Sequence, residues 1–358
     1  MSATGRIEGA ATRLARAGLA GLAMAGLAAC GGGGGGGAAP QPAAITADNA
    51  ELISAEVLAV IGLASGVGPS GAGGVIGSDA GGTGAEALRL GAAGRRTILQ
   101  AGALEAFGPE ELDCIVGGTV VIGGDIANFD TLTAGDVINA TFTDCDDGFG
   151  EVLNGALRLD VVVGANPTDD FENGLFAAAF NATFTAFRID ADDGSFTTDG
   201  TARIDLDTTQ SPEEAILSGT SLRFTQGSDR YTLTDFAVAL LVNALGNPAT
   251  TQVAGTGTLA SNDFTGTVDF VTEVDLVAAG DDDPDEGVVE VFGAAGSQIR
   301  ITVQDSVNLQ LQVDVDGNDQ TDVTIATTWE VLRSIAGAGT VGSSVLQEFN
   351  PVGGRGPG

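Results

Sequence analysis

The heptapeptide NATFTDC (Asn139–Cys145) recurs further along the chain as NATFTAF (Asn181–Phe187). Each copy is followed by an acidic DDG turn and then by a strand-like segment that contains a glycine, LNGALRLDV or TDGTARIDL. YTLTDF (Tyr231–Phe236) is a weaker third copy. Alternating side chains point to opposite faces of a β-strand, so a period of two indicates strands. The repeat therefore predicts β-hairpins that arose by duplication.

The same period extends over most of the chain. Segments rich in Thr, Val, Ile and Phe are separated by clusters of Gly, Asp, Asn and Pro, as in strands joined by hairpins. The segments are 114–123, 135–145, 151–163, 175–190, 201–207, 214–225, 231–242, 252–260, 264–276, 287–293, 297–303, 308–316 and 322–329. We expect a mainly β protein with a large antiparallel meander of about a dozen strands. A curved sheet, a closed barrel-like sheet or a sandwich would each protect its edges.

A helix is predicted ahead of the strands. The segment ITADNAELISAEVLAVIGLA (45–64) has apolar residues at the spacing of one helical face, namely Ile53, Val57, Val60, Ile61 and Ala64. Thr46 or Asp48 could cap its start. A Gly- and Ser-rich stretch follows, and RRTILQAGALEAFG (95–108) predicts a second short helix. The predicted organisation is thus a helical and loop segment over 46–108, a β-domain over 109–335 and a flexible tail over 336–358.

The charged residues exclude several classes of function. Among 358 residues there are 48 acids and 14 basic residues, all arginine, with no lysine or histidine and a net charge of −34. Phosphate backbones would be repelled, so we expect no nucleic-acid partner. Histidine bases, histidine metal ligands and Schiff-base lysines are impossible. These absences predict a protein that is not an enzyme.

The N-terminal segments follow one another in the order typical of a secretory signal peptide. Arg6, Arg13 and Arg16 precede LAGLAMAGLAA, an apolar run too short to span a bilayer. It ends in Leu27-Ala28-Ala29-Cys30, before seven glycines and AAPQPAA. Glycine-rich segments of this kind form flexible linkers. The sequence therefore predicts a signal peptide over 1–29 and a Gly/Pro/Ala tether over 30–45.

The segment Leu27-Ala28-Ala29-Cys30 resembles the lipobox of bacterial lipoproteins. The resemblance implies cleavage before Cys30, acylation of this cysteine and attachment to a membrane through lipid. Several acyl chains hold a protein far more strongly than one. Gly31 stands where inner-membrane lipoproteins of the enteric type carry aspartate, which implies the outer membrane, facing the periplasm or the cell surface.

The other two cysteines, Cys114 and Cys145, flank the first pair of strand-like segments. An envelope address permits a disulfide. No histidine or lysine is present to activate a thiol, and two cysteines do not make a zinc site. We therefore predict that Cys114 and Cys145 pair with each other.

One turn could bind a cation. In DVDGNDQTD, the residues Asp314, Asp316, Asn318 and Asp322 occupy positions 1, 3, 5 and 9, with the carbonyl of Gln320 near position 7. The spacing resembles the calcium loops on β-hairpins of integrin-like and FG-GAP repeats, which implies Ca²⁺ bound by hard oxygen ligands. The dipeptide Gly317-Asn318 is equally typical of an ordinary hairpin turn. Both interpretations stay open.

Other charged and aromatic residues favour structural roles. The run DDDPDEG (281–287) is expected to be a solvated acidic loop, with weak cation binding as the alternative. Arg158/Asp160, Arg188/Asp190 and Arg203/Asp205 each lie two residues apart on one strand face, which predicts cross-strand Arg–Asp ladders on a solvated surface rather than a ligand site. Trp329 is expected in the core.

Three functions are compatible with these features. The first is a membrane-anchored envelope lipoprotein whose non-catalytic β-domain binds an unidentified protein or polymer or has a structural role, with stabilisation by calcium. The second is a periplasmic carrier that holds an apolar ligand on a curved sheet. The third, a hydrolase, needs two convergent carboxylates about 5–10 Å apart in a cleft.

Overall fold

A computed structural model describes residues 41–65, 109–127, 133–146, 151–165, 177–191, 194–243, 248–279 and 283–336. The predicted signal peptide, Cys30, the tether as far as residue 40, the second helix at 95–108 and the C-terminal tail beyond residue 336 lie outside the described residues. No helix in the described ranges is long and apolar enough to cross a membrane.

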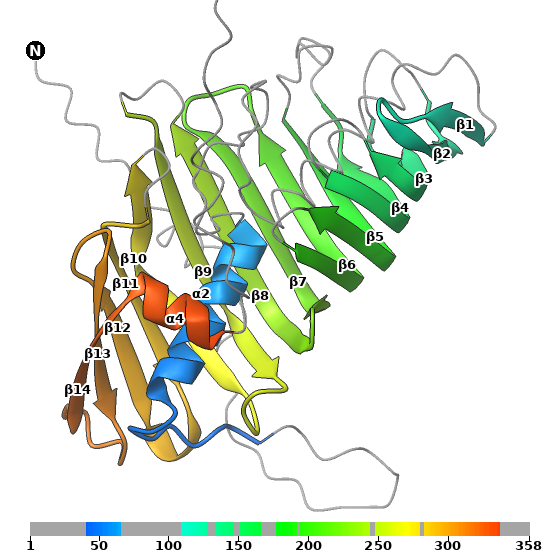
Figure 1. Cartoon of the computed structure of the whole chain (residues 1–358). Helices are drawn as coiled ribbons and strands as arrows, with labels where there is room; N and C mark the ends of the chain where they lie inside the picture. The colour runs from blue at the N-terminus through cyan, green and yellow to red at the C-terminus, as the bar shows by residue number, and fades with distance from the viewer. Residues whose placement is uncertain are drawn as a thin grey trace, which may run out of the picture.

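The described chain forms one antiparallel sheet in which every strand pairs with its neighbours in sequence (Figure 1). The strands are β1 (Glu110–Asp113), β2 (Gly117–Asp125), β3 (Val137–Asp146), β4 (Glu151–Val163), β5 (Ala177–Ala191), β6 (Gly194–Asp207), β7 (Glu213–Gln226), β8 (Asp229–Asn243), β9 (Thr250–Ser261), β10 (Val268–Ala279), β11 (Glu286–Phe292), β12 (Gln298–Val303), β13 (Asn308–Asp314) and β14 (Val323–Thr328). Because β1 and β14 do not pair with each other, the sheet is open. The mainly β meander is confirmed, as a single curved sheet.

All thirteen strand-like segments of the sequence contain a strand. Strand β1 was not predicted, because its four residues EELD carry three charges and no apolar alternation. The short helix α4 (Trp329–Ile335), which directly follows β14, was not predicted either. It is capped by the Thr328 hydroxyl, which accepts a hydrogen bond from Val331 N–H. A short 3₁₀ turn, η1 (Ala294–Gly296), links β11 to β12.

The predicted first helix is α2 (Ala50–Ser65). Thr46 and Asp48, the predicted caps, both lie before the observed start of the helix. The first helical hydrogen bond runs from Ile53 N–H to the Asn49 carbonyl. The Asn49 side chain also accepts from the backbone N–H of Thr46, which closes the turn before the helix. The start of α2 is therefore set by Asn49.

The curved sheet folds around α2 and α4 (Figure 1). Helix α2 contacts β8, β9, β12, β13 and α4. Six consecutive residues of α2, from Ile53 to Leu58, are buried, so this part of the helix is enclosed on all sides rather than on the one predicted face. One apolar core joins α2 and α4 to the inner face of the sheet.

The repeated heptapeptides place β-bulges in the sheet. Asp144, Ala186 and Asp235 occupy equivalent positions in the three copies and have φ angles of 46°, 44° and 46°. Strand register shifts at each of them. The extra residue puts Phe184 and Phe187, three apart, on the same buried face. Bulges bend a strand and increase its twist, which curves the sheet.

Neighbouring strands are adapted to these bulges. Asn154 and Asp199 accept hydrogen bonds from the backbone N–H groups of Asp144 and Ala186, at 2.9 and 2.7 Å. Gly155 has φ +89°, and a Cβ there would lie 2.1 Å from the carbonyl oxygen of Ala186. Asn154 thus accepts the backbone N–H of the bulge at Asp144, and Gly155 leaves room for the backbone of the bulge at Ala186.

Gly155→Ala is expected to destabilise the protein by about 2–3 kcal/mol, because the methyl group meets the Ala186 carbonyl and strains the backbone. The control Gly117→Ala should leave stability unchanged or slightly raised, since a Cβ there has open space. Denaturant unfolding of both variants measures the difference. Equal stability of the two variants would contradict the role given to Gly155.

Candidate functional site

Cys114 and Cys145 form a disulfide, with Cα atoms 5.4 Å apart, which confirms their predicted pairing. Cys145 follows the bulge residue Asp144 and is buried. The bond joins the end of β1 to β3 across β2, so the short edge strand is held covalently to the sheet.

The predicted calcium loop connects β13 to β14. One carboxylate oxygen from each of Asp314, Asp316 and Asp322 lies within 4.8 Å of the others. Burial acts to raise the pKa of Asp314, but hydrogen bonds from the backbone N–H groups of Gly317, Asp319, Asn318 and Asp316 outweigh it and hold the pKa below its usual value. The structure thus brings three of the five predicted ligands together.

The remaining contacts of this loop are those of a hairpin turn. Asp322 accepts from Val315 N–H at 2.8 Å, and the Asn318 side-chain oxygen accepts from Gln320 N–H at 2.8 Å. Both oxygens of Asp314 accept backbone N–H groups. These bonds shape the turn without an ion, so calcium at Asp314–Asp322 stays a prediction.

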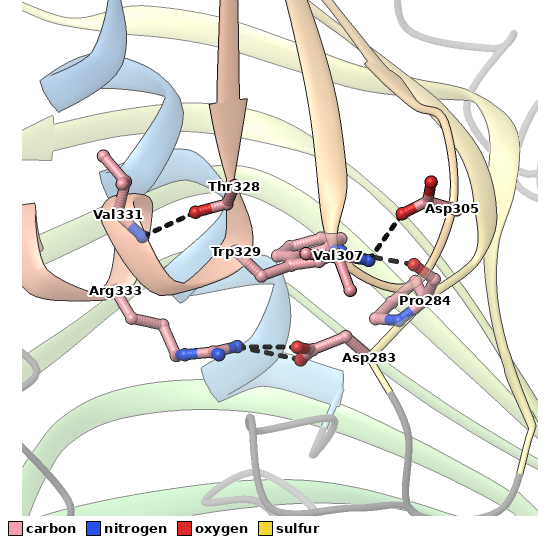
Figure 2. Close-up of polar contacts among 8 residues, drawn as sticks. All are labelled: Asp283, Pro284, Asp305, Val307, Thr328, Trp329, Val331 and Arg333. Atoms are coloured by element: carbon pink, nitrogen blue, oxygen red, sulfur yellow. Dashed lines mark hydrogen bonds and ion pairs between the residues drawn. The ribbon is translucent and has the colours of Figure 1, made fainter.

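The described part of the acidic run 281–287 contacts α4 (Figure 2). Asp283 accepts hydrogen bonds from the Arg333 guanidinium at 2.8 and 3.0 Å, and the Pro284 carbonyl accepts from the Trp329 indole at 3.2 Å. The Asp283 side chain is only 19% exposed. This segment therefore anchors α4, instead of being only a solvated loop as predicted. Trp329 is buried, as predicted.

The three arginine–aspartate pairs lie on the outer face of the sheet. Their N–O distances are 2.5 Å for Arg158–Asp160, 2.6 Å for Arg188–Asp190 and 2.7 Å for Arg203–Asp205. Each pair runs along one strand, two residues apart, whereas ladders across strands were predicted from the sequence. Their side chains are one-third to one-half exposed, and ion pairs of this kind contribute little to stability.

Helix α2 carries a buried carboxyl group that was not predicted from the sequence. Glu56 is 0% exposed and points to the ends of β8 and β9, where its Oε2 accepts a hydrogen bond from the Ser261 hydroxyl at 3.1 Å. Its Oε1 has no partner with full hydrogen-bond geometry among the described residues, and the Tyr231 hydroxyl and the Asp263 carboxyl group also interact with the Glu56 side chain. We call Glu56, Asp229, Ser261 and Asp263 the Glu56 cluster.

The surroundings of Glu56 disfavour the charged form of its carboxyl group. Burial raises the pKa of Glu56 from 4.5 to about 7; the charges of Asp263 and Asp229 add to this, whereas the Ser261 hydrogen bond opposes it. Burial and the nearby Glu56 also raise the pKa of Tyr231 well above its usual value. The carboxyl group therefore takes up a proton near neutral pH.

The helical period of the sequence could have indicated that Glu56 is buried. Glu56 lies three residues after Ile53 and four before Val60, both on the predicted apolar face, so a 3.6-residue period places its side chain at the edge of that face. The partners in the turns of the sheet could not be read from the sequence, since they lie about 170–210 residues away.

No family model, curated protein sequence or solved structure matches this chain.

Glu56→Gln is expected to be more stable than the wild type at about pH 8 in the presence of chelator. The folded state holds the Glu56 proton to higher pH than the unfolded chain does, so the free energy of unfolding falls as pH rises from 4.5 to about 7 and stays low above that range. The gain should reach about 1–3 kcal/mol, allowing for screening by water around the exposed Asp263.

Urea unfolding at several pH values measures this gain. The control is Glu51→Gln, in the first turn of the same helix, whose side chain is half-buried. A stability difference between Glu56→Gln and wild type that is the same at about pH 4 and about pH 8 would show that Glu56 does not titrate as described.

Proposed function

We propose that the chain is a bacterial envelope lipoprotein, anchored to the outer membrane through lipid on Cys30, and that its β-domain is a non-catalytic binding or structural module. The Cys114–Cys145 disulfide is the observation that carries this proposal. Disulfides persist in oxidising compartments such as the periplasm and the cell surface. With these two cysteines paired, Cys30 is the remaining one of three, and it follows the lipobox-like segment.

The attachment of the tether to the β-domain supports an anchored module. The Ala43 N–H donates to the Thr267 carbonyl at 2.7 Å, the Thr267 N–H donates to Gln41 at 3.0 Å, and the Ala294 N–H donates to Ala43 at 2.7 Å. The end of the tether is thus held by backbone hydrogen bonds to the turns after β9 and β11. A force applied through the lipid anchor would therefore act on the sheet before it acts on α2.

Glycines make this attachment possible. A Cβ at Gly266 would lie 2.5 Å from the carbonyl oxygen of Gln41, and one at Gly293 would lie 2.5 Å from that of Ala43. Ile45, the last residue before the turn into α2, is 1% exposed. The junction between tether and domain is therefore a packed part of the structure.

The packing of the inner face favours a structural or protein-binding module over a carrier of apolar ligands. A carrier needs an open apolar concavity. Along β5 to β8 the large inner side chains Phe180, Phe187, Phe224 and Tyr231 are at most 2% exposed. They are parts of a filled core, and the absence of histidine and lysine from the chain supports a role without catalysis.

Cys30→Ala is expected to move the protein from the membrane fraction to the soluble fraction and to abolish labelling by a fatty-acid analogue, because the acyl chains supply the membrane affinity. Gly31→Asp serves as the matched variant. It should keep the lipid, and by the resemblance to enteric lipoproteins it should shift the protein from the outer to the inner membrane. Membrane retention of Cys30→Ala would refute the anchor.

A further inference from the structure

Strand β14 forms one of the two open edges of the sheet (Figure 1). Its six residues, VTIATT (Val323–Thr328), include no charged residue, proline or glycine. They pair with β13 in six consecutive residue pairs without a register shift. Natural sheets normally protect their edges with charges, prolines, bulges or very short strands. Strand β14 has none of these protections along its length.

The opposite edge of the sheet is protected. Strand β1 has only four residues, of which three are acidic, and the Cys114–Cys145 disulfide joins its end to β3. Charges along an edge discourage a second strand from pairing with it. Of the two edges, β14 is therefore the one whose composition suits the addition of another strand.

The backbone of β14 has hydrogen-bonding groups on its free side. Trp329 N–H donates to the Val307 carbonyl, and the register places Ile325 in the same hydrogen-bonded series with β13. The intervening residues Thr324 and Ala326 therefore direct their N–H and C=O groups away from β13. Both residues are exposed. No strand of the described chain pairs with this side, and helix α4 leaves the end of β14 to pack on α2.

The side chains of β14 indicate what an added strand would carry. Val323 and Ile325 point to the inner face, where they pack against the core but stay half-buried. Apolar residues opposite them would complete their burial. Thr327, on the same face, is 6% exposed, and its hydroxyl has no hydrogen-bond partner among the described residues. A serine or threonine opposite it would supply one.

The charges at one end of β14 define the chemistry of the partner further. The hairpin loop that leads into β14 carries Asp316, Asp319 and Asp322, all of which are exposed. In an antiparallel pair, the C-terminal end of the added strand lies beside this loop. Basic residues at that end would be attracted to the loop, whereas acidic residues would be repelled.

The same charges disfavour a second copy of the chain as the partner. Antiparallel pairing of two β14 strands would bring the acidic loop of one copy toward Glu330 of the other, an exposed residue in the first turn of α4. Each copy would also carry a net charge of −34. Like charges that face each other are destabilising. A different protein with basic residues fits this edge better.

We propose that β14 binds an extended segment of a partner protein, which joins the sheet as an antiparallel strand with apolar residues on the inner face and basic residues at its C-terminal end. Hydrogen bonds to the backbone of Thr324 and Ala326 supply affinity, and the side chains decide which segment binds. The proposal rests on the proposed function of the β-domain as a binding module. It does not depend on lipid at Cys30, so either proposal can fail without the other.

A synthetic peptide, Thr-Thr-Gln-Ile-Thr-Val-Lys-Lys with a fluorescent N-terminal label, tests the edge. Its isoleucine and valine would lie opposite Ile325 and Val323, its second threonine opposite Thr327, and its lysines beside the acidic loop. Fluorescence anisotropy with the full chain, in non-ionic detergent and chelator, should show saturable binding. A control peptide with both lysines moved to the N-terminus should bind about two- to fivefold more weakly, because the attraction to the loop is lost.

A second control peptide removes the hydrogen bonds alone. In the proposed register, the glutamine and the third threonine of the peptide direct their N–H groups toward β14. N-methylation of these two residues should weaken binding by at least about tenfold, since each hydrogen bond contributes on the order of 1 kcal/mol.

Two substitutions at one position of β14 make the same test on the protein. Ala326→Pro removes an N–H on the free side of an edge strand, a place where proline is tolerated, and should weaken peptide binding by at least about tenfold. Ala326→Thr keeps this N–H and should bind as the wild type does. Circular dichroism and thermal unfolding show whether Ala326→Pro is folded. If it is not, the N-methylated peptide tests the same hydrogen bonds on the wild-type protein.

Four results would overturn the proposal. The first two are an absence of saturable binding to the full chain and an affinity that N-methylation does not change. The third is a dimer, seen by analytical ultracentrifugation, that Ala326→Pro dissociates, since a second copy would then occupy the edge. The fourth is peptide binding that appears only when residues 337–358 are deleted, which would assign the edge to the C-terminal segment of the chain itself.

Discussion

The apolar inner face of the sheet has to be covered, and along β8, β9, β12 and β13 the cover is α2. Burial of apolar surface is the main favourable contribution to folding, so this packing stabilises the strands that α2 covers. Gly255 shows how close the contact is, since a Cβ there would lie 3.2 Å from the Ile61 side chain. The helix precedes every strand in sequence, yet its contacts require hairpins formed far along the chain. Its packing is therefore a long-range interaction.

β-Bulges bend several strands of the sheet, and the one at Asp235 lies in β8, which packs on α2. A flat sheet could contact a single helix along only a few strands. Asp144, Ala186 and Asp235 each place an extra residue in a strand, and glycines such as Gly155 on neighbouring strands accept the displaced backbone. Each copy of the repeated heptapeptide thus bends the strand in which it lies. The outer face stays solvated through charged pairs such as Arg158–Asp160.

Much of the fold could be predicted because it depends on local patterns. Alternation located every strand except β1, which lacks apolar alternation, and the helical period located α2. The pairing of Cys114 with Cys145 followed from cysteine chemistry. The sequence could not show that one open sheet would enclose α2, that Asp283 would anchor α4, or that Glu56 would meet Ser261. Each of these depends on contacts between distant segments.

Native-state hydrogen exchange of the full chain tests most directly whether α2 and the sheet form one cooperative core. The amides of Ile53 to Ile61 should exchange with the same free energy of opening as those in the centres of β8 and β9, because the helix cannot leave without exposing the inner face of those strands. Loss of protection in α2 at a clearly lower free energy, with β8 and β9 still protected, would contradict this account.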